Sequence, residues 1–488
     1  MASANNSRQL LFVVLAVAAS AILLWFGTGL FPWWPLMWIA PLPVLLVAAR
    51  SSWWGAMLAA FAAWTIGGFT MEHYFTTSLH MHLGVWIQID AGQAVMFALA
   101  VLLFRALLKR GAWWSALVGF PAARVSYEYL LNLSSPHGTA LNAAYSELNC
   151  LPVLQLAALT GPWGISFLMF GFSAALAIGI HLRATAPKQA LRIVGATAGV
   201  VAAALIFGAI RLASPPPAGQ EVRVGLVASD APGNTGVAEP GKDADRLFRE
   251  YAGKISELAA QGAQAVVIPE NLGVLLDSNA SSTDATFQPI ADKAHITIVV
   301  GVGHVEPAVR FNEARVYTPS APVRLYAKHH LLPPFELKFT PGKTLLTMDE
   351  PKGIWGVAIC KDMDFTQLSR ENGRAGVGLL LVPAWDFVLD RFEHGHMAVM
   401  RGVESGFGVA RAARGGYLTI SDNRGRIVAE TRSNSAPFAT LIADVPAVHD
   451  TTLYLLLGDW FAWVALALFG FALVQLVRLR ILTRQVIR

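Results

Sequence analysis

The sequence predicts a membrane protein of about eight transmembrane α-helices that carries one α/β domain outside the bilayer. Three observations predict this class. Hydrophobic residues make up 55% of the 488 positions and charged residues 14%, whereas soluble domains average about 25% charged residues. Apolar runs of near-spanning length recur along the chain, and one long polar segment, 214–450, interrupts them. We therefore expect a transmembrane domain at 1–213, an α/β domain at 214–450, and a last span with a basic tail at 451–488.

Each apolar run is close to the ~20 residues that cross a bilayer as a helix. The runs cover residues 10–27, 33–49, 53–71, 91–108, 113–130, 162–182, 192–213 and 455–477. The first run has the length of a signal peptide. No small-x-small cleavage site follows it and further spans do, so we expect a retained helix.

Basic residues predict the orientation of the spans. Lys and Arg near the apolar runs fall on alternate sides of successive spans, and therefore on one face, which the positive-inside rule makes cytoplasmic. These residues are Arg8, Arg50, the cluster 105–110, the stretch 183–192, and Arg478, Arg480, Arg484 and Arg488. The segment 214–450 then lies on the opposite face. We expect a multi-pass protein with its α/β domain outside the cytoplasm, which is the periplasm if the cell has two membranes, as for a protein of the bacterial inner membrane.

The net charge of +5 comes largely from these flanking residues. No basic stripe interleaved with aromatic side chains accompanies it, so the sequence does not indicate nucleic-acid binding. The membrane is the partner that this charge pattern favours.

The polar segment alternates short strands with helical stretches after the linker Ser214–Gly219. A helix is predicted from about Asp243 to Gln261. The predicted strands are 222–227, 265–270, 296–302, 323–327, 354–360, 377–383 and 416–421. This alternation favours a layered α/β domain of about 230 residues.

Three of the predicted strands end at reactive side chains, Glu270, Lys328 and Cys360. Glu270 can take the thiol proton as a general base, Lys328 can stabilise an oxyanion, and Cys360 can form a thioester. Taken singly, each residue has an ordinary explanation, because charged residues at strand ends are usually solvated and a lone cysteine is usually a small buried hydrophobe. Together they predict nucleophilic acyl transfer. Lys361 is expected to lower the pKa of the neighbouring thiol.

The residues around these positions resemble the nitrilase, or carbon–nitrogen hydrolase, superfamily. The similar segments are Pro269–Glu270, Tyr326–Glu336 and Ile359–Cys360. A domain of this kind between a seventh and an eighth span resembles the apolipoprotein N-acyltransferase family in particular, as do Gly161–Leu168 and His394–Ala398. The resemblance implies a four-layer αββα domain and the catalytic residues of a Glu-Lys-Cys triad. Glu270 would be the base, Lys328 the oxyanion stabiliser, Cys360 the nucleophile and Glu336 the residue that orients the lysine.

The resemblance also implies a two-step, ping-pong reaction without a cofactor. Cys360 would take an acyl chain from a phospholipid as a thioester and pass it to the N-terminal amine of a diacylglyceryl-cysteine lipoprotein. Two alternatives stay open at this point. In the first, the chain is a membrane-tethered enzyme, either a nitrilase-type amidase or an acyltransferase with a different amine acceptor. In the second, the α/β domain is degenerate and is retained only for binding.

The chain departs from the family's pattern on the acceptor side of the site. Lys361-Asp362 stands where the family usually carries an aromatic residue and then Glu, and Pro383–Asp386 and Arg411–Gly416 replace segments that contain Asn in the family. We expect Lys361, Asp362 and Trp385 to contact the substrate. The departures leave the triad chemistry in place and the identity of the acceptor open.

Four residues outside the predicted triad, Trp86, His394, His396 and Cys150, could also contribute to a site. Trp86 is expected to contact substrate from the apolar loop 72–90, and an amphipathic segment resting on the bilayer explains that loop equally well. His394 and His396 have no clear third ligand, so no metal site is predicted. Cys150 has no partner except Cys360, and we interpret it as structural.

Overall fold

The computed structural model describes residues 2–215 and 220–486, with side chains for 9–215 and 220–481. Residues 216–219 of the expected linker, Arg488 of the basic tail, and the side chains of Arg8 and Arg484 lie outside the described part. The chain packs into two compact units. The helical unit holds residues up to 133, 141–210 and from 459 onward, and the α/β unit holds 134–140 and 211–458. The predicted domain limits at 213 and 450 remain predictions.

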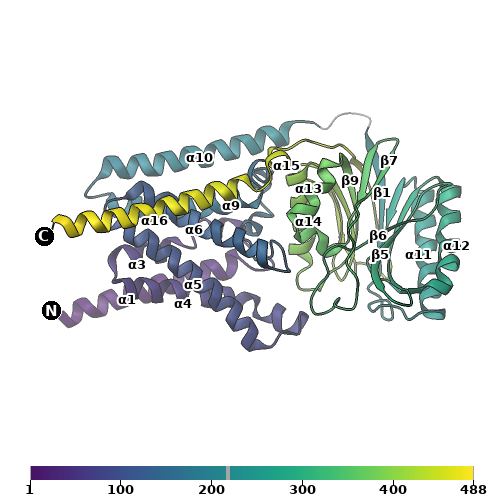
Figure 1. The fold of residues 1–488 in the computed structure, drawn as a ribbon, viewed down its shortest axis with the longest axis horizontal. Coiled ribbons are helices and arrows are strands. Elements are labelled where there is room, and N and C mark those ends of the chain that lie inside the picture. The colour runs from purple at the N-terminus through teal and green to yellow at the C-terminus, as the bar shows by residue number, and fades with distance from the viewer. Residues whose placement is uncertain (1, 216–219, 487–488) are drawn as a thin grey trace. The chain divides into compact units, whose positions relative to one another are not determined.

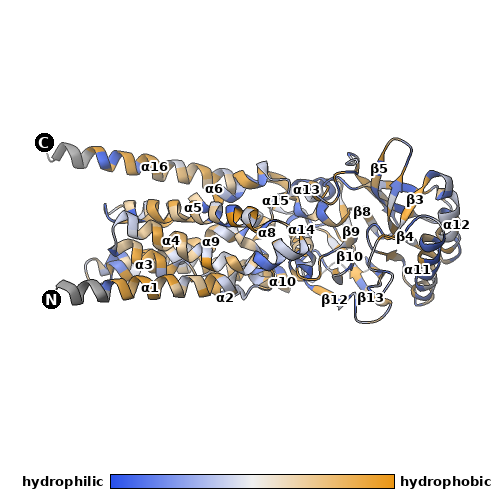
Figure 2. Ribbon diagram, turned by 90° about the horizontal axis from the view of Figure 1, so that it is seen from below, coloured by the Kyte–Doolittle hydropathy of each residue, from blue (hydrophilic) through white to orange (hydrophobic). Residues whose placement is uncertain are grey.

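The helical unit contains helices that are long and apolar enough to cross a membrane (Figure 2). Six helices meet this description among the described residues. They are α1 (Ala2–Gly27), α4 (Trp53–Gly68, continuing to Met71), α5 (Leu83–Leu108), α9 (Pro162–Leu182), α10 (Pro187–Ala213) and α16 (Trp460–Val486). The protein is therefore a multi-pass membrane protein.

Two predicted spans fall outside these six helices. The run 33–49 forms two shorter helices, α2 (Trp34–Met37) and α3 (Leu42–Arg50), because Pro41 and Pro43 interrupt it. The run 113–130 forms α6 (Trp113–Ser134), which carries Pro121 and a buried ion pair between Arg124 and Glu128. The predicted number of eight spans therefore remains a prediction. Helix α5 also begins at Leu83, earlier than expected, so the second half of the loop 72–90 is helical.

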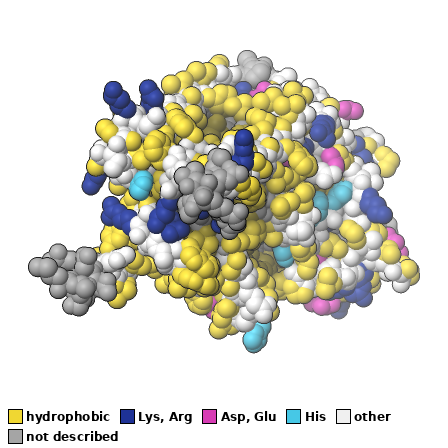
Figure 3. Space-filling model, turned by 60° about the vertical axis from the view of Figure 1, so that its left-hand side comes forward, with side chains coloured by type: hydrophobic (Ala, Val, Ile, Leu, Met, Phe, Trp, Pro, Cys, Tyr) yellow, Lys and Arg dark blue, Asp and Glu magenta, His cyan; other side chains and the backbone are white. Residues whose placement is uncertain are grey.

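Basic side chains gather at one end of the helical unit (Figure 3). Arg105 and Lys109, from the last turns of α5, both donate to the carbonyl oxygen of Ser51, which follows α3. The distances are 2.9 Å from Arg105 Nη2 and 3.2 Å from Lys109 Nζ. Cations at helix C-termini satisfy backbone carbonyls that have no partner within the helix.

The α/β unit contains two sheets. The first has the order β13 (Ala439–Pro446), β1 (Glu221–Ala228), β2 (Ala265–Val267), β4 (Thr297–Val305), β5 (Arg310–Tyr317) and β6 (Arg324–Ala327), with β3 (Val274–Leu276) beside β4. The second has the order β12 (Ile427–Arg432), β11 (Tyr417–Ser421), β10 (Gly408–Arg414), β9 (Val377–Trp385), β8 (Gly353–Val357) and β7 (Leu346–Glu350).

The two sheets pack face to face, and helices cover both outer faces (Figure 1). Helices α11 (Lys242–Ala260) and α12 (Asp277–Ala294) lie on the first sheet, and α13 (Thr366–Arg374) and α14 (Arg391–Ser405) on the second. Side chains alternate between the layers as strand geometry requires. In β9, Leu379 and Leu381 enter the core between the sheets, whereas Leu380 enters the core under the helices. The predicted layered α/β domain is confirmed.

Most of the predicted strands and the helix near 243–261 are present, but two strand ends were predicted wrongly. Strand β8 ends at Val357, and Cys360 begins the short 3-10 helix η4 (Cys360–Asp364). Strand β2 ends at Val267, three residues before Glu270. The sequence analysis missed β3, β5, β7, β10, β12 and β13. In β10 the two arginines do not look like core residues in the sequence, although both are buried.

Candidate active site

The proposed nucleophile, Cys360, sits at a sharp turn between β8 and η4. Its φ angle is +42°, in the left-handed region that non-glycine residues rarely adopt. Strain of this kind collects at functional sites, where the surrounding structure holds it. The turn is held in part by the thiol, which donates to the carbonyl oxygen of Trp385 at 3.4 Å. Trp385 is the last residue of β9, so the strand beside the turn helps to fix the sulfur.

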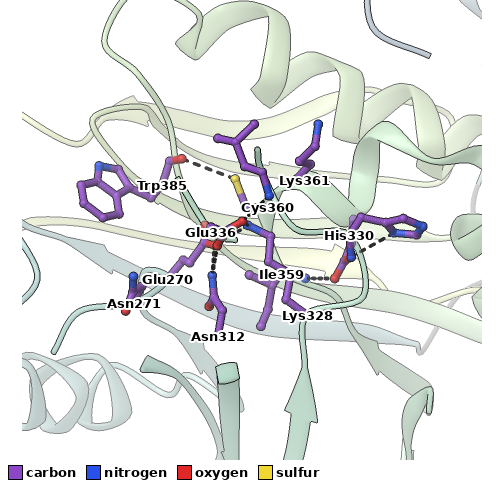
Figure 4. A network of polar contacts seen from close by, with 12 residues as sticks. Glu270, Asn271, Asn312, Lys328, His330, Glu336, Ile359, Cys360, Lys361 and Trp385 are labelled. Atoms are coloured by element: carbon purple, nitrogen blue, oxygen red, sulfur yellow. Dashed lines mark hydrogen bonds and ion pairs between the residues drawn. The ribbon is translucent and has the colours of Figure 1, made fainter. Parts of the chain in front are cut away.

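Two buried carboxylates flank the lysine (Figure 4). Lys328 Nζ donates to Glu270 Oε1 at 2.7 Å and to Glu336 Oε2 at 2.8 Å. Asn312 Nδ2 donates to the same two side chains, at 2.5 Å each. The backbone N–H of Leu332 adds a further bond to Glu336 Oε2 at 2.6 Å. The two glutamates are therefore held apart by one ammonium and one amide group.

Burial and the close contacts in this group determine which of its side chains are charged. Burial, and then the charge of Glu270, raise the pKa of the Cys360 thiol well above its ordinary value, although Lys328 and Arg411 act in the opposite direction. Burial also raises the pKa of Glu270, against the effect of Lys328. Burial by itself would lower the pKa of Lys328, but Glu270, Cys360 and Glu336 raise it, so the lysine stays protonated. The resting site therefore holds a thiol, and a base must remove its proton before attack.

We predicted that Asp362 contacts the substrate, but its carboxylate is surrounded by groups of the protein. Its carboxylate is fully buried and accepts hydrogen bonds from protein groups on both oxygens. Oδ2 accepts from the backbone N–H of Ile359 at 3.0 Å and from the hydroxyl of Tyr326 at 2.8 Å. Oδ1 accepts from the backbone N–H groups of His329 and His330 at 3.1 and 2.9 Å. Asp362 thus ties the turn before Cys360 to the segment after Lys328.

Lys361 also differs from the prediction. Its side chain is directed away from the thiol (Figure 4) and is buried. The ammonium group donates to Asp364 Oδ2 at 2.9 Å and lies 3.3 Å from His137 Nδ1. The cations that act on the thiol are Lys328 and Arg411. The sequence therefore predicted the wrong second cation.

Arg411 belongs to a buried ion pair next to the nucleophile. Its guanidinium group binds both oxygens of Asp386, at 2.7 and 2.5 Å, and both residues are almost fully buried. Asp386 directly follows Trp385, whose carbonyl oxygen accepts from the thiol. Parallel pairing of β9 with β10 brings the two residues together. A fork-to-carboxylate pair of this geometry is rigid, so it fixes the end of β9.

Trp385 is partly exposed, and its indole ring lies under the guanidinium group of Arg414, 3.5 Å from the ring centre. Trp86 lies in the helical unit, on α5, where it is buried and stacks on Phe75 with 4.4 Å between the ring centres. The roles of both tryptophans in substrate binding remain predictions.

One group near the site has the spacing of a metal site, namely Asp386, Asp390 and His394. Arg411 already neutralises Asp386, and His394 Nδ1 binds Asp390 Oδ2 at 2.9 Å. The group is therefore satisfied by its own protein cations, and we derive no metal chemistry from it. His396 lies apart, with Nδ1 2.9 Å from the carbonyl oxygen of Phe392.

Sequence reasoning missed Asn312, the Asp386–Arg411 pair and the partners of Asp362. The signal for Asn312 is weak, because it is one polar residue in a strand that already contains Glu313 and two arginines. The available signal for Tyr326 and His329 is their place beside Lys328 in the sequence.

Comparison with known proteins supports one class. Residues 20–175 match the apolipoprotein N-acyltransferase N-terminal domain, and residues 238–449 match the carbon-nitrogen hydrolase family. The fold and the site thus define a membrane protein that carries a carbon–nitrogen hydrolase domain. Within that class, the chain belongs to the apolipoprotein N-acyltransferase family.

Two relatives match along nearly their whole length. The apolipoprotein N-acyltransferase of Gloeobacter violaceus is 24% identical, and the match covers 96% of this chain and 95% of the relative. That of Geobacter metallireducens is 26% identical and covers 89% of each chain. Among solved structures, an amidase from Nesterenkonia sp. aligns with a TM-score of 0.42 and 19% identity, over 51% of this chain and 97% of the amidase.

Proposed function

We propose that this protein moves an acyl chain from a phospholipid to the N-terminal amine of a diacylglyceryl-cysteine lipoprotein, through a thioester on Cys360. The observation that carries the mechanism is the arrangement of one thiol, one ammonium group and two carboxylates joined by Asn312. Family membership supports the two substrates.

In the first half-reaction, Glu270 takes the proton of the Cys360 thiol and the sulfur attacks the ester carbonyl carbon of the phospholipid. Lys328 stabilises the oxyanion of the tetrahedral intermediate by charge and hydrogen bonding. The carbon–oxygen bond to the glycerol then breaks. The protonated Glu270 gives its proton to the leaving alkoxide, and lysophospholipid departs. The product on the protein is a Cys360 thioester.

In the second half-reaction, the amine of the acceptor attacks the thioester carbonyl carbon. Glu270 takes a proton from the nitrogen, Lys328 again stabilises the oxyanion, and the carbon–sulfur bond breaks. The thiolate recovers its proton from Glu270. Glu336 and Asn312 do not react in this scheme, but they fix the position of Lys328 and Glu270.

Exposed apolar side chains beside the site support a lipid substrate. We call Phe335, Leu337, Trp385 and Val388 the apolar rim. Leu337 is 72% exposed and Val388 59%, and Phe335 contacts Phe387 with 5.6 Å between the ring centres, so the two loops that carry these residues meet. Exposed apolar patches mark sites of ligand or membrane contact. Phe335 and Leu337 flank Glu336 in the sequence, and Trp385 contacts the nucleophile. We propose that the rim receives acyl chains.

The membrane arrangement is a further part of the proposal. We infer eight spans, with the α2–α3 pair and α6 as the two that complete the set. The α/β unit lies in the periplasm and the basic end of the helical unit faces the cytoplasm, in the inner membrane. A maleimide that cannot cross membranes tests the orientation. It should label an exposed Lys343→Cys introduced into the Cys360→Ser background when only the outer membrane is permeabilised, and labelling only after lysis would contradict it.

Intact-protein mass spectrometry after incubation with phospholipid in detergent tests the acyl-enzyme. We expect a hydroxylamine-labile mass gain of one acyl chain that is lost in Cys360→Ser. Cys150→Ser is the matched control, because Cys150 is the other free cysteine, and it should retain the adduct. A labile adduct that persists in Cys360→Ser, or no adduct in the folded wild type, would overturn the mechanism. Transfer of the acyl chain to a small amine but not to a diacylglyceryl-cysteine peptide would favour a different acceptor.

A further inference from the structure

The segment Ser134–Ala140 packs against the turn that carries the nucleophile. It belongs to the α/β unit, although the chain on either side of it belongs to the helical unit. Thr139 contributes two hydrogen bonds to the carbonyl oxygen of Asp364, from its backbone N–H at 3.1 Å and from its hydroxyl at 2.7 Å. Asp364 is the last residue of η4, the 3-10 helix that begins at Cys360. The segment therefore contacts the element that bears the reactive sulfur.

The close approach depends on a glycine. Gly138 has a φ of +54°, and a Cβ atom added to it would lie 2.5 Å from the carbonyl oxygen of Asp364. A side chain at this position would collide with the backbone of η4. The same φ is strained for any other residue. The local chain is thus shaped to bring Thr139 into contact with Asp364.

Lys361 completes the contact with a buried charge. Its ammonium group donates to Asp364 Oδ2 at 2.9 Å and lies 3.3 Å from His137 Nδ1, and it faces the ring of Phe365 at 5.8 Å. The side chains of Lys361 and Asp364 are 6% and 4% exposed. Burial, and then the charge of Lys361, lower the pKa of His137, so a neutral imidazole can accept from the ammonium group. Burial by itself would raise the pKa of the Asp364 carboxyl group, but the charges of Lys361 and His394 lower it below the ordinary value.

We propose that Lys361 is a positioning residue, which fixes the nucleophile turn by docking the segment Ser134–Ala140 onto η4 through Asp364 and His137. Lys361 acts on the geometry of Cys360 and not on the charge of its sulfur. This inference concerns how the proposed acyl transfer is supported, and in that respect it depends on the proposed function.

Three variants and two control variants test the inference in the full-length protein. Lys361→Met removes the ammonium group and keeps the length of the side chain, and Lys361→Arg restores a cation. Gly138→Ala opens the contact from the other side without a change in charge. Gly253→Ala is the matched control for it, since nothing lies within 4 Å of the added Cβ atom. Lys293→Met, at an exposed position on α12, is the control for the loss of a lysine.

Three measurements compare the variants with the wild type. Amide hydrogen exchange over 134–142 should become faster in Lys361→Met and Gly138→Ala and stay unchanged in the controls. The rate of acyl-enzyme formation should fall about 10- to 100-fold in the same two variants, because a small misplacement of a nucleophile costs this much. Lys361→Arg should recover most of the rate. The pH midpoint for alkylation of Cys360 by iodoacetamide should not move in Lys361→Met.

The outcomes separate the inference from the proposed function. Unchanged hydrogen exchange in both Lys361→Met and Gly138→Ala would overturn the docking role, whatever the enzyme does with lipids. An alkylation midpoint that rises in Lys361→Met would show that the lysine acts on the sulfur directly, and would also overturn it. If wild type forms no acyl-enzyme, the proposed function fails, and exchange and alkylation still decide the role of Lys361. If Lys361→Met does not fold, Gly138→Ala carries the same test.

Discussion

The backbone carbonyl oxygen of Asn312 accepts a hydrogen bond from the backbone N–H of Lys328 at 2.8 Å, and the side chains of these two residues bridge the same pair of glutamates. A β5 residue and the residue after β6 are thus held side by side by main-chain pairing. Each carboxylate accepts one bond from the Asn312 amide and one from the Lys328 ammonium group, and Glu336 also accepts from the backbone N–H of Leu332. The site depends on both donors, because two buried carboxylates that lose one of them repel each other.

Asn312→Ala should therefore slow acyl-enzyme formation by about 100-fold, because the loss of a preorganised donor costs on this order. Asn312→Asp should be worse, since it adds a third carboxylate to the group. Single-turnover acylation followed by mass spectrometry measures the effect. Gln367→Ala, at an exposed position on α13, is the control. Equal rates in Asn312→Ala and wild type would mean that Lys328 alone organises the glutamates.

Cys360 should react as a thiol in the resting protein. Burial and Glu270 raise its pKa, so alkylation by iodoacetamide should be slow at pH 7 and should increase with pH around a midpoint above the ~8.5 of free cysteine. Glu270→Gln removes a negative charge beside the sulfur. It should shift this midpoint to lower pH and, at the same time, abolish acylation, because the base is lost. A wild-type midpoint near neutrality would instead indicate a preformed thiolate.

The decrease of the acylation rate at low pH should follow the protonation of Glu270. Burial raises the pKa of this carboxyl group, and only its ionised form can take the thiol proton. Acylation should therefore be lost as the pH falls, at a higher pH than the ~4.3 of an exposed glutamate predicts. The rate of acylation measured from pH 4 to pH 9 checks this. If the acylation rate falls only at or below about pH 4.3, the general base is a group other than Glu270.

Asp362→Ala should destabilise the α/β unit. The change leaves the backbone N–H groups of Ile359, His329 and His330 without their acceptor, and each such buried group costs about 1–3 kcal/mol. We expect a loss of about 3 kcal/mol or more in the free energy of unfolding, measured by urea denaturation in detergent. Asp349→Ala, at an exposed position on β7, should change stability little. Full stability with lost activity would point to a direct contact with substrate.

Leu337→Asp should weaken the binding of phospholipid. The side chain is largely exposed, so the change should not unfold the protein, but it puts a charge on the apolar rim. KM for phospholipid in detergent should rise, whereas alkylation of Cys360 by the small reagent iodoacetamide should be unchanged. Ile427→Asp, at an exposed position on β12, is the control. An unaltered KM in Leu337→Asp would remove the rim from the path of the lipid.

Glu336 was expected only from the resemblance to the nitrilase superfamily. The sequence by itself determined the membrane class, the layered α/β domain, and the places of Glu270, Lys328 and Cys360 near strand ends. These features are local or periodic: apolar runs measure spans, and alternating strands mark sheets. It did not determine where the strands end at the site. Cys360 and Glu270 each lie three residues beyond their strands, because short turns carry them.

Only the tertiary structure decided which residues support the catalytic groups. Asn312 reaches Glu270 across 42 residues of sequence, Arg411 reaches Asp386 across 25, and Lys361 reaches His137 across 224. Such pairs have no periodic signal, because strand pairing and loop packing bring them together. The direction of the Lys361 side chain was decided in the same way. Its neighbour in the sequence is the nucleophile, but its polar partners are Asp364 and His137.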